Sequence, residues 1–160
     1  MILSNKIKNV IVCAIIGITA VFYFSTIREG HDWDDDFSMY IHHAKNIVEG
    51  ISYKNTGYIY NYFNPYIGPK TYPPIFPILL SPIYKWYGLN LTAMKIEIIF
   101  MFLIFLIVFY LIFRKEFPFK YMVAIILILG FNPFFWNFKD NIMSDIPFLF
   151  FVYFSFPYID

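Results

Sequence analysis

An acidic cluster is the densest group of ionisable side chains in this sequence of 160 residues. It lies in the string HDWDDDF and consists of Asp32, Asp34, Asp35 and Asp36. Carboxylates this close together attract cations, so the cluster could supply a general base, bind a divalent cation, or do both. The alternative is structural, because negative charge in the first turn of a helix stabilises it by roughly 0.3–1 kcal/mol per group. Spacing alone favours the structural interpretation.

Three histidines lie close to this cluster and invite a metal-binding interpretation, since imidazole beside carboxylate is common zinc or iron ligation. They are His31, His42 and His43. Adjacent residues on a helix point about 100° apart, so His42 and His43 do not both face one ion with ease. The spacing therefore favours an interfacial or hydrogen-bonding role, with substrate contact as the next alternative, and the sequence specifies no metal.

A further acid, Asp145, stands in the string SDIP just before a late apolar run. An acid at such a place often marks a functional cavity, because a charge in hydrocarbon is costly. An acid next to Ser144 can equally form the start of a helix. The sequence leaves these two interpretations open.

The composition indicates a membrane protein. Hydrophobic residues make up 59% of the chain and charged residues 14%, whereas a soluble domain carries about 25% charged residues. The net charge of +1 provides no basic excess for a phosphate backbone, so no nucleic-acid partner is expected. The single Cys13 excludes an intramolecular disulfide and a multi-cysteine metal site.

The apolar windows predict an all-α, polytopic integral membrane protein with three full transmembrane helices and a partial fourth. Crossing about 30 Å of hydrocarbon takes about 20 apolar residues. The expected spans are residues 9–27, 91–113 and 121–138, and the partial span is residues 146–160. Lys95 and Glu97 are expected to reach the headgroups. A cleaved signal peptide is the alternative for the first span, but no A-x-A-like site follows it.

The distribution of lysine and arginine orients these spans. Lys6 and Lys8 precede the first span, and the link RKEFPFK joins the second to the third. Because such residues mark cytoplasmic segments, we expect a cytoplasmic amino terminus and an extracytoplasmic loop over residues 28–90, in a bacterial-type plasma membrane. The last apolar run is too short to cross. Residues 1–160 are therefore expected to be the amino-terminal portion of one membrane domain, with a re-entrant last segment as the alternative.

Residues 28–90 are expected to form two juxtamembrane helices rather than a linker, because linkers are poor in aromatic residues. Apolar residues recur with helical spacing over 36–49, and Gly50 stands where such a helix would end. The Tyr72-Pro73-Pro74 step excludes helix up to that point. The apolar string IFPILLSPIYKWYG that follows predicts the second helix.

The order of these features resembles a family, the polytopic sugar transferases of the C-type glycosyltransferase fold. These enzymes use polyprenyl-phosphate-linked sugars and include protein O-mannosyltransferase-like and aminoarabinose-transferase-like members. The resemblance covers the amino-terminal part of such an enzyme. The residues that carry it are Asp35 and Asp36, then Tyr40, Ala44, Asn46 and Gly50, and later the string YPPIFPILL from Tyr72 to Leu80.

The resemblance implies that Asp35 or Asp36 is the catalytic base that deprotonates or orients the acceptor for attack on the anomeric carbon. Asp145 resembles the second acid that is typical of the next outer loop. The expected substrate-binding residues are Asp34, Tyr40, His43, Tyr72 and Asp145. The implied partners are a polyprenyl-phosphate-linked sugar, membrane lipid and an unknown acceptor. No certain cofactor is implied, and a divalent cation is the one candidate.

Family members are much longer, so residues 1–160 alone are expected to be inactive. A different class of function is a non-enzymatic small membrane subunit or part of a transporter. Transporters place polar groups near the middle of the membrane, whereas the acids of this chain gather at the ends of its apolar windows. That distribution favours an enzyme.

Overall fold

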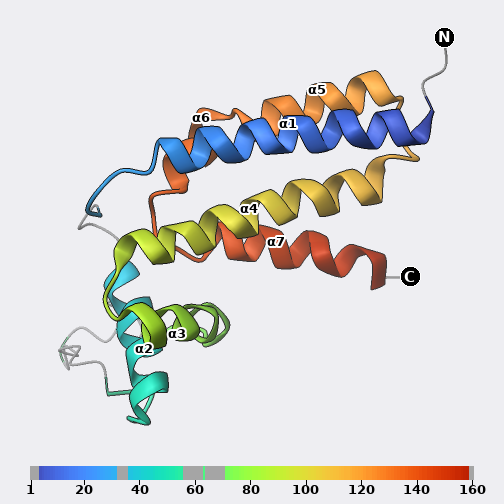
Figure 1. Ribbon diagram of the computed structural model, residues 1–160. Coiled ribbons are helices and arrows are strands. Elements are labelled where there is room, and N and C mark those ends of the chain that lie inside the picture. The colour runs from blue at the N-terminus through green and yellow to red at the C-terminus, as the bar shows by residue number, and fades with distance from the viewer. Residues whose placement is uncertain (1–3, 32–35, 56–62, 64–70, 159–160) are drawn as a thin grey trace.

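The computed structural model describes residues 4–31, 36–55, 63 and 71–158, and its secondary structure over these residues is entirely helical. The helices are α1 (Asn5–Ser25), α2 (Phe37–Glu49), α3 (Ile75–Tyr87), α4 (Leu91–Phe113), α5 (Phe119–Gly130), α6 (Pro133–Phe138) and α7 (Asp145–Ser155), followed by a 3-10 turn, η1 (Phe156–Tyr158). The all-α prediction is thus confirmed. Figure 1 shows α1, α4, α5 and α7 side by side in one bundle, with α2 and α3 at one end of it.

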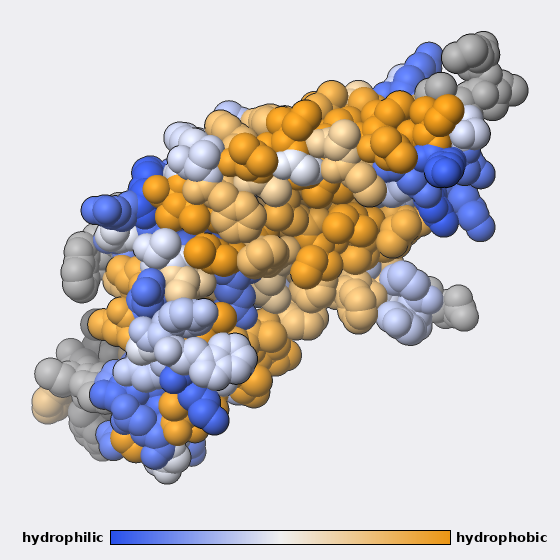
Figure 2. Space-filling view, viewed as in Figure 1, coloured by the Kyte–Doolittle hydropathy of each residue, from blue (hydrophilic) through white to orange (hydrophobic). Residues whose placement is uncertain are grey.

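Two helices, α1 and α4, are long and apolar enough to cross a membrane. Each begins at a polar cap, because the side chain of Ser4 accepts a hydrogen bond from the Ile7 amide and that of Asn90 accepts one from the Ala93 amide. Figure 2 shows a hydrophobic band over the middle of the bundle and hydrophilic residues at both of its ends. The predicted second span, 91–113, coincides with α4.

The predicted third span, residues 121–138, is not one helix. α5 ends at Gly130 after 12 residues, which rise only about 18 Å. Asn132 then caps the six-residue α6 by accepting a hydrogen bond from the Phe134 amide at 2.8 Å, and Pro133 takes the first helical position. The fourth apolar run is short, as expected, because α7 has 11 residues.

The core of the bundle lies around α4, which contacts α1, α3, α5 and α7. Its buried residues include Met94, Ile98, Phe102 and Leu106. The ring of Phe102 stacks on Tyr23 of α1 with the two centroids 5.2 Å apart. α4 therefore joins α1 and α7, which both pack against it.

The helices α2 and α3 form a second unit at the end of the bundle, and they coincide with the two helices predicted for residues 28–90. The predicted stop at Gly50 is confirmed, since this glycine has a φ of +67° and closes α2 in the left-handed conformation. Aromatic contacts between α2 and α3 include Tyr40 with Phe76, whose ring centroids are 5.0 Å apart.

Close packing of α1 against α5 depends on Gly130. A Cβ atom at this position would stand 2.9 Å from the Oγ1 atom of buried Thr19, whereas one at Gly17 would meet nothing within 4 Å. We expect Gly130→Ala to lower the free energy of unfolding in detergent by about 1–3 kcal/mol, because the helices must separate. Gly17→Ala is the matched control and is expected to be neutral or slightly stabilising. Equal effects of the two variants on thermal unfolding would contradict this packing.

Candidate functional site

One end of the bundle collects every predicted site residue that the structure describes. α2 and α3 lie there, together with the end of α1 and the starts of α4 and α7 (Figure 1). Asp36, Tyr40, His43, Tyr72 and Asp145 are therefore at the same end of the molecule. Asp34 and Asp35 lie outside the described residues, as does Asp32.

Asp36 and Tyr72 form a hydrogen-bonded pair on the surface of this end. The Tyr72 hydroxyl donates to the Asp36 Oδ1 atom at 2.5 Å, across 36 residues of sequence. Asp36 stands at the N-cap of α2, but its side chain makes no capping hydrogen bond. Its carboxylate is exposed. The exposed carboxylate can therefore contact a bound molecule, while the hydrogen bond from Tyr72 fixes its orientation.

Tyr40 links α2 to both α3 and α7. Its hydroxyl lies 3.1 Å from the hydroxyl of Ser144, next to the start of α7. Its ring centroid is 5.0 Å from that of Tyr72. Tyr40 and Tyr72 therefore lie where α2, α3 and α7 meet, and Tyr72 forms the hydrogen bond with Asp36.

An apolar groove opens beside these tyrosines between α2, α3 and α7. Its volume is about 470 Å³, and most of its lining is hydrophobic. The lining residues are Tyr40, Pro73, Ile75, Phe76, Ser144, Pro147, Phe148, Phe151, Val152 and Ser155. We call it the α7 groove, because half of its lining comes from that helix. It could take a chain-like apolar ligand whose polar end remains near Asp36.

Asp145 is exposed in the first turn of α7, directly after Ser144 of the groove. Ser144 makes no capping hydrogen bond with its side chain, which is engaged with Tyr40 instead. The acid at the start of α7 therefore adds negative charge where the helix dipole favours it. The start of α7 lies at the same end of the bundle as α2, so Asp145 and Asp36 share that end.

His43 is fully buried and forms hydrogen bonds with the backbone of Tyr53 and Tyr72. Its Nδ1 atom donates to the Tyr53 carbonyl at 2.9 Å, and its Nε2 atom accepts from the Tyr72 amide at 3.2 Å. Burial lowers the pKa of His43, although the hydrogen bond with the Tyr53 carbonyl opposes this effect. The neutral imidazole fits both bonds. His43 thereby positions Tyr72 and offers no free ring nitrogen to a substrate.

His31 and His42 do not join His43 in a ligand set. The His31 Nε2 atom accepts from the Ile142 amide at 2.8 Å, and its ring stacks on Phe37 with centroids 3.7 Å apart. Over the residues that the structure describes, no three His, Cys, Asp or Glu side chains come together as metal ligands. The acidic cluster, where a divalent cation was considered, falls mostly outside those residues.

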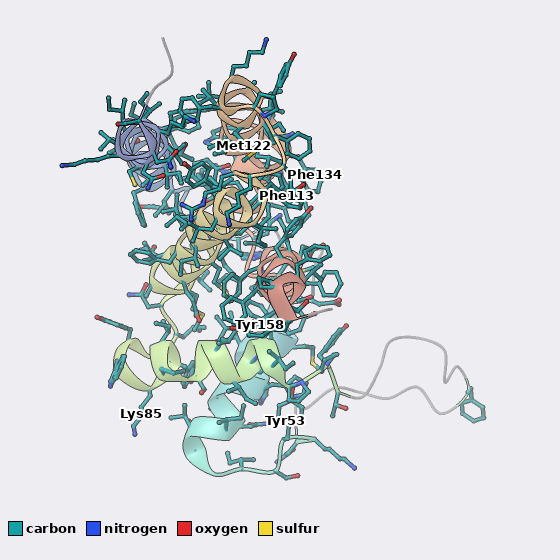
Figure 3. All side chains as sticks on the ribbon, turned by 90° about the vertical axis from the view of Figure 1, so that its right-hand side faces the viewer. Tyr53, Lys85, Phe113, Met122, Phe134 and Tyr158 are labelled. Carbon is teal, nitrogen blue, oxygen red and sulfur yellow. The ribbon has the colours of Figure 1, made fainter. Side chains whose placement is uncertain are left out.

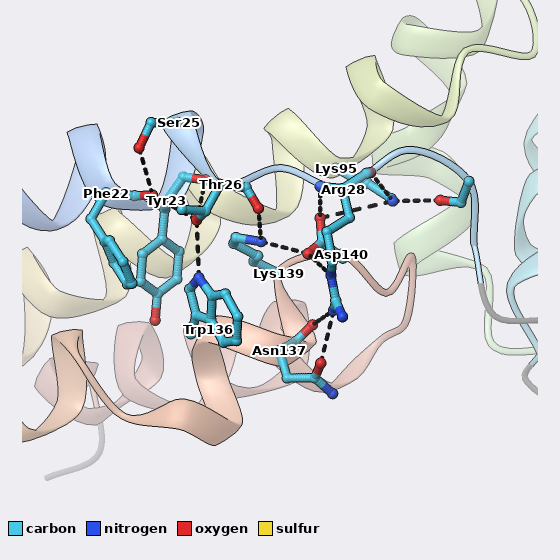
Figure 4. A network of polar contacts seen from close by, with 11 residues as sticks. Phe22, Tyr23, Ser25, Thr26, Arg28, Lys95, Trp136, Asn137, Lys139 and Asp140 are labelled. Carbon is cyan, nitrogen blue, oxygen red and sulfur yellow. Dashed lines mark hydrogen bonds and ion pairs between the residues drawn. The ribbon is translucent and has the colours of Figure 1, made fainter.

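An ionic network fastens the segment after α1 to the segment before α7, and Figure 4 shows its contacts; its lysines and its carboxylate are buried, whereas Arg28 is exposed. At its centre Asp140 accepts from the Lys139 ammonium at 2.5 Å, from the Arg28 Nε atom at 2.8 Å and from the Arg28 amide at 3.0 Å. Lys95 of α4 lies 3.8 Å from the same carboxylate. We call Asp140, Arg28, Lys95 and Lys139 the Asp140 network.

The two lysines of this network also tie down the chain after α1. Lys139 donates to the Thr26 carbonyl at 2.7 Å, and Lys95 donates to the carbonyls of Arg28 and Gly30. Exposed fractions are 0% for Lys139, 1% for Lys95 and 4% for Asp140. Burial alone would raise the pKa of Asp140, but the hydrogen bonds from Lys139 and Arg28 hold it below its usual range. The network thus keeps the segment that leads into the acidic cluster in a fixed position.

The sequence did not predict this network. Lys95 was expected to extend to the headgroups, whereas the structure buries its side chain. Lysines at the ends of apolar windows usually reach water, and Lys139 directly follows the predicted third span. The one local signal is the adjacent, opposite charges of Lys139 and Asp140. Glu97, also expected at the headgroups, is half-buried, and its Oε2 atom is buried without a hydrogen-bond partner over the described part of the chain.

No protein-family model, no curated protein and no solved structure matches this chain.

Proposed function

We propose that the chain is the amino-terminal part of a membrane glycosyltransferase that transfers a sugar from a polyprenyl-phosphate donor to an acceptor on the extracytoplasmic side. Because residues 1–160 alone are expected to be inactive, the transfer experiments use a longer protein that carries residues 1–160 at its amino terminus. The observation that carries the proposal is the Asp36–Tyr72 pair beside the apolar α7 groove. A donor of this class needs both features, because its isoprenoid must be buried while its sugar meets a base at headgroup level.

The proposal also includes further membrane segments besides the two candidate spans α1 and α4. α5 together with α6 forms a third segment in the bilayer, and α7 forms a fourth beside α4. The lysines and arginines at the start of α1 and between α4 and α5 put that end in the cytoplasm. α2, α3 and the Asp36–Tyr72 pair then lie at the extracytoplasmic surface. The hydrophobic band of Figure 2 supports this arrangement.

In the proposed reaction the isoprenoid occupies the α7 groove, and the phosphate and sugar lie at its mouth. Asp36, or the neighbouring Asp35, accepts the proton of the acceptor group as that group attacks the anomeric carbon. The bond from the anomeric carbon to the phosphate oxygen breaks, and polyprenyl phosphate leaves with the electron pair. Asp34, Tyr40, Tyr72 and Asp145 are the proposed contacts to donor and acceptor, and a divalent cation is a candidate partner for the phosphate.

The role of the groove can be tested by filling it. Val152→Trp adds bulk to the groove lining, whereas Ile128→Trp adds the same indole on an exposed position of α5. In membranes that contain the protein, Val152→Trp is expected to raise the KM for the polyprenyl-phosphate sugar about tenfold. A tenfold loss of affinity corresponds to about 1.4 kcal/mol, which is roughly the free energy lost when two methylene groups of the isoprenoid are no longer buried.

Ile128→Trp should leave that KM unchanged at equal protein level. The result that contradicts the proposed groove is an unchanged KM for Val152→Trp, or the same rise for both variants. A donor with a shorter prenyl chain serves as a further control, since it should lose less affinity than the long donor when the groove is filled.

A second candidate function is a non-enzymatic membrane subunit or part of a transporter, and Glu97 favours it. A carboxylate oxygen buried within an apolar helix without a partner among the described residues is typical of ion pathways. The glycosyltransferase proposal gives Glu97 no part in the reaction. The position of the exposed acids beside an apolar groove supports the enzyme more strongly.

A further inference from the structure

A polar pocket lies at the end of the bundle opposite the candidate site. It has a volume of about 280 Å³ and is enclosed by the start of α1, the end of α4 and the start of α5. This end faces the viewer in Figure 3, where Phe113 and Met122 mark α4 and α5. The lining includes Lys8, Asn9, Tyr110, Arg114, Lys115 and Phe119. We call it the basic pocket.

The pocket is built from contacts between three helices. The Tyr110 hydroxyl of α4 donates to the Asn9 Oδ1 atom of α1 at 2.7 Å. The ammonium of Lys8 lies over the ring of Phe119 in α5, 5.8 Å from its centroid. These contacts fix the walls, to which α1 contributes Lys8 and the end of α4 contributes Arg114 and Lys115.

The charge of the pocket has one sign. Lys8, Arg114 and Lys115 are lining residues, and no carboxylate lines the pocket with them. Within the described residues, none of the three forms an ion pair. The amino-terminal ends of α1 and α5 also lie at this pocket, and both add positive potential, whereas the end of α4 adds negative potential that Arg114 offsets.

The pocket stands where the hydrophobic band of the bundle ends (Figure 2). Phe117, Pro118 and Phe119 give it an apolar edge beside the cations. A ligand that suits this combination has an anionic phosphate group and an apolar tail. We propose that the basic pocket binds the phosphate headgroup of an anionic phospholipid in the leaflet on the amino-terminal side. The proposal rests on membrane insertion and is independent of sugar transfer.

Two double variants with the same change in charge test this proposal. Lys8→Gln with Arg114→Gln removes two cations from the lining, whereas Lys6→Gln with Lys120→Gln removes two cations at the same end that are absent from it. The purified protein is titrated in detergent with phosphatidylglycerol or with zwitterionic phosphatidylethanolamine, and bound lipid is counted by native mass spectrometry. Unchanged circular dichroism shows that each variant is folded.

The wild-type protein should bind phosphatidylglycerol in preference to phosphatidylethanolamine. The pocket variant should lose this preference by tenfold or more, on the order of the effect of two basic residues at a membrane surface, and the control variant should keep it. Equal loss in both variants, or no preference in the wild type, would overturn the proposal in favour of diffuse surface charge. Inorganic phosphate is added as a competitor, and displacement of the lipid by millimolar phosphate would overturn the lipid as the ligand and assign the pocket to soluble phosphate.

Discussion

Replacing Asp36 by asparagine is expected to slow sugar transfer by about 10²- to 10⁴-fold, the usual range for loss of a general base. Asparagine keeps the size of the side chain and its oxygen can still accept from the Tyr72 hydroxyl. It removes only the ability to take the acceptor's proton. The measurement is transfer from a polyprenyl-phosphate sugar in membranes that contain the protein, with protein level determined in parallel.

The neighbouring acids provide the controls for this prediction. Asp32→Asn and Asp34→Asn should reduce transfer far less, because these residues do not act as the base in the proposed reaction. If Asp35 is the base instead, the large loss moves to Asp35→Asn. A purely structural role makes a different prediction, since asparagine caps a helix about as well as aspartate. Four fully active single variants would therefore assign the cluster to the start of α2 and remove it from catalysis.

The largest effect on stability is expected from Asp140→Asn. This change removes the carboxylate that Lys139 and Arg28 share, while Lys139 remains completely buried. Breaking a buried ion pair from one side costs about 3–5 kcal/mol, because the remaining charge is left without its counter-ion. Thermal unfolding in detergent, followed by circular dichroism, should show a correspondingly lower midpoint for this variant.

Asp145→Asn is the matched control, since Asp145 is exposed in the first turn of α7, a few residues beyond Asp140, and its replacement should change stability by no more than about 0.5 kcal/mol. The pH dependence has a defined sign. Because the pKa of Asp140 is lowered in the folded protein, its contribution is fully present above about pH 4 and is lost as the pH falls further. A difference between wild type and Asp140→Asn that persists in strong acid would contradict the role of this charge.

Local pattern was sufficient to predict most of the helices. The apolar stretch of α4 is uninterrupted over more than four turns, so both its type and its bounds could be predicted. α2 was recognised from its amphipathic spacing and from Gly50, whose left-handed conformation favours glycine. In these two segments the burial of apolar residues alone decides the structure. α2 buries one face and α4 is apolar on all sides.

The break between α5 and α6 was missed although its signal was in the sequence. Asn132 and Pro133 are the residue types that begin a helix, but they lie inside the apolar window 121–138, which predicted one continuous span. Hydropathy averaged over such a window does not register a cap.

The contacts of the candidate site could be predicted only in part. The resemblance singled out Asp36, Tyr40 and Tyr72, and the structure brings these three residues together. The hydrogen bonds from the Tyr72 amide to His43 and from Arg28 to Asp140 join residues 29 and 112 positions apart. Periodicity and charge counts carry no information on such pairs, because the partner is chosen by the packing of the whole bundle.

The most direct test of the account is transfer of labelled sugar from a polyprenyl-phosphate donor in membranes that contain the protein. The account predicts label in an acceptor that depends on the protein and on the carboxylate of Asp36 or Asp35, on the side of the membrane that carries α2 and α3. Absence of transfer with every polyprenyl-phosphate sugar supplied, from membranes in which the longer protein that carries residues 1–160 is inserted and folded, would contradict it.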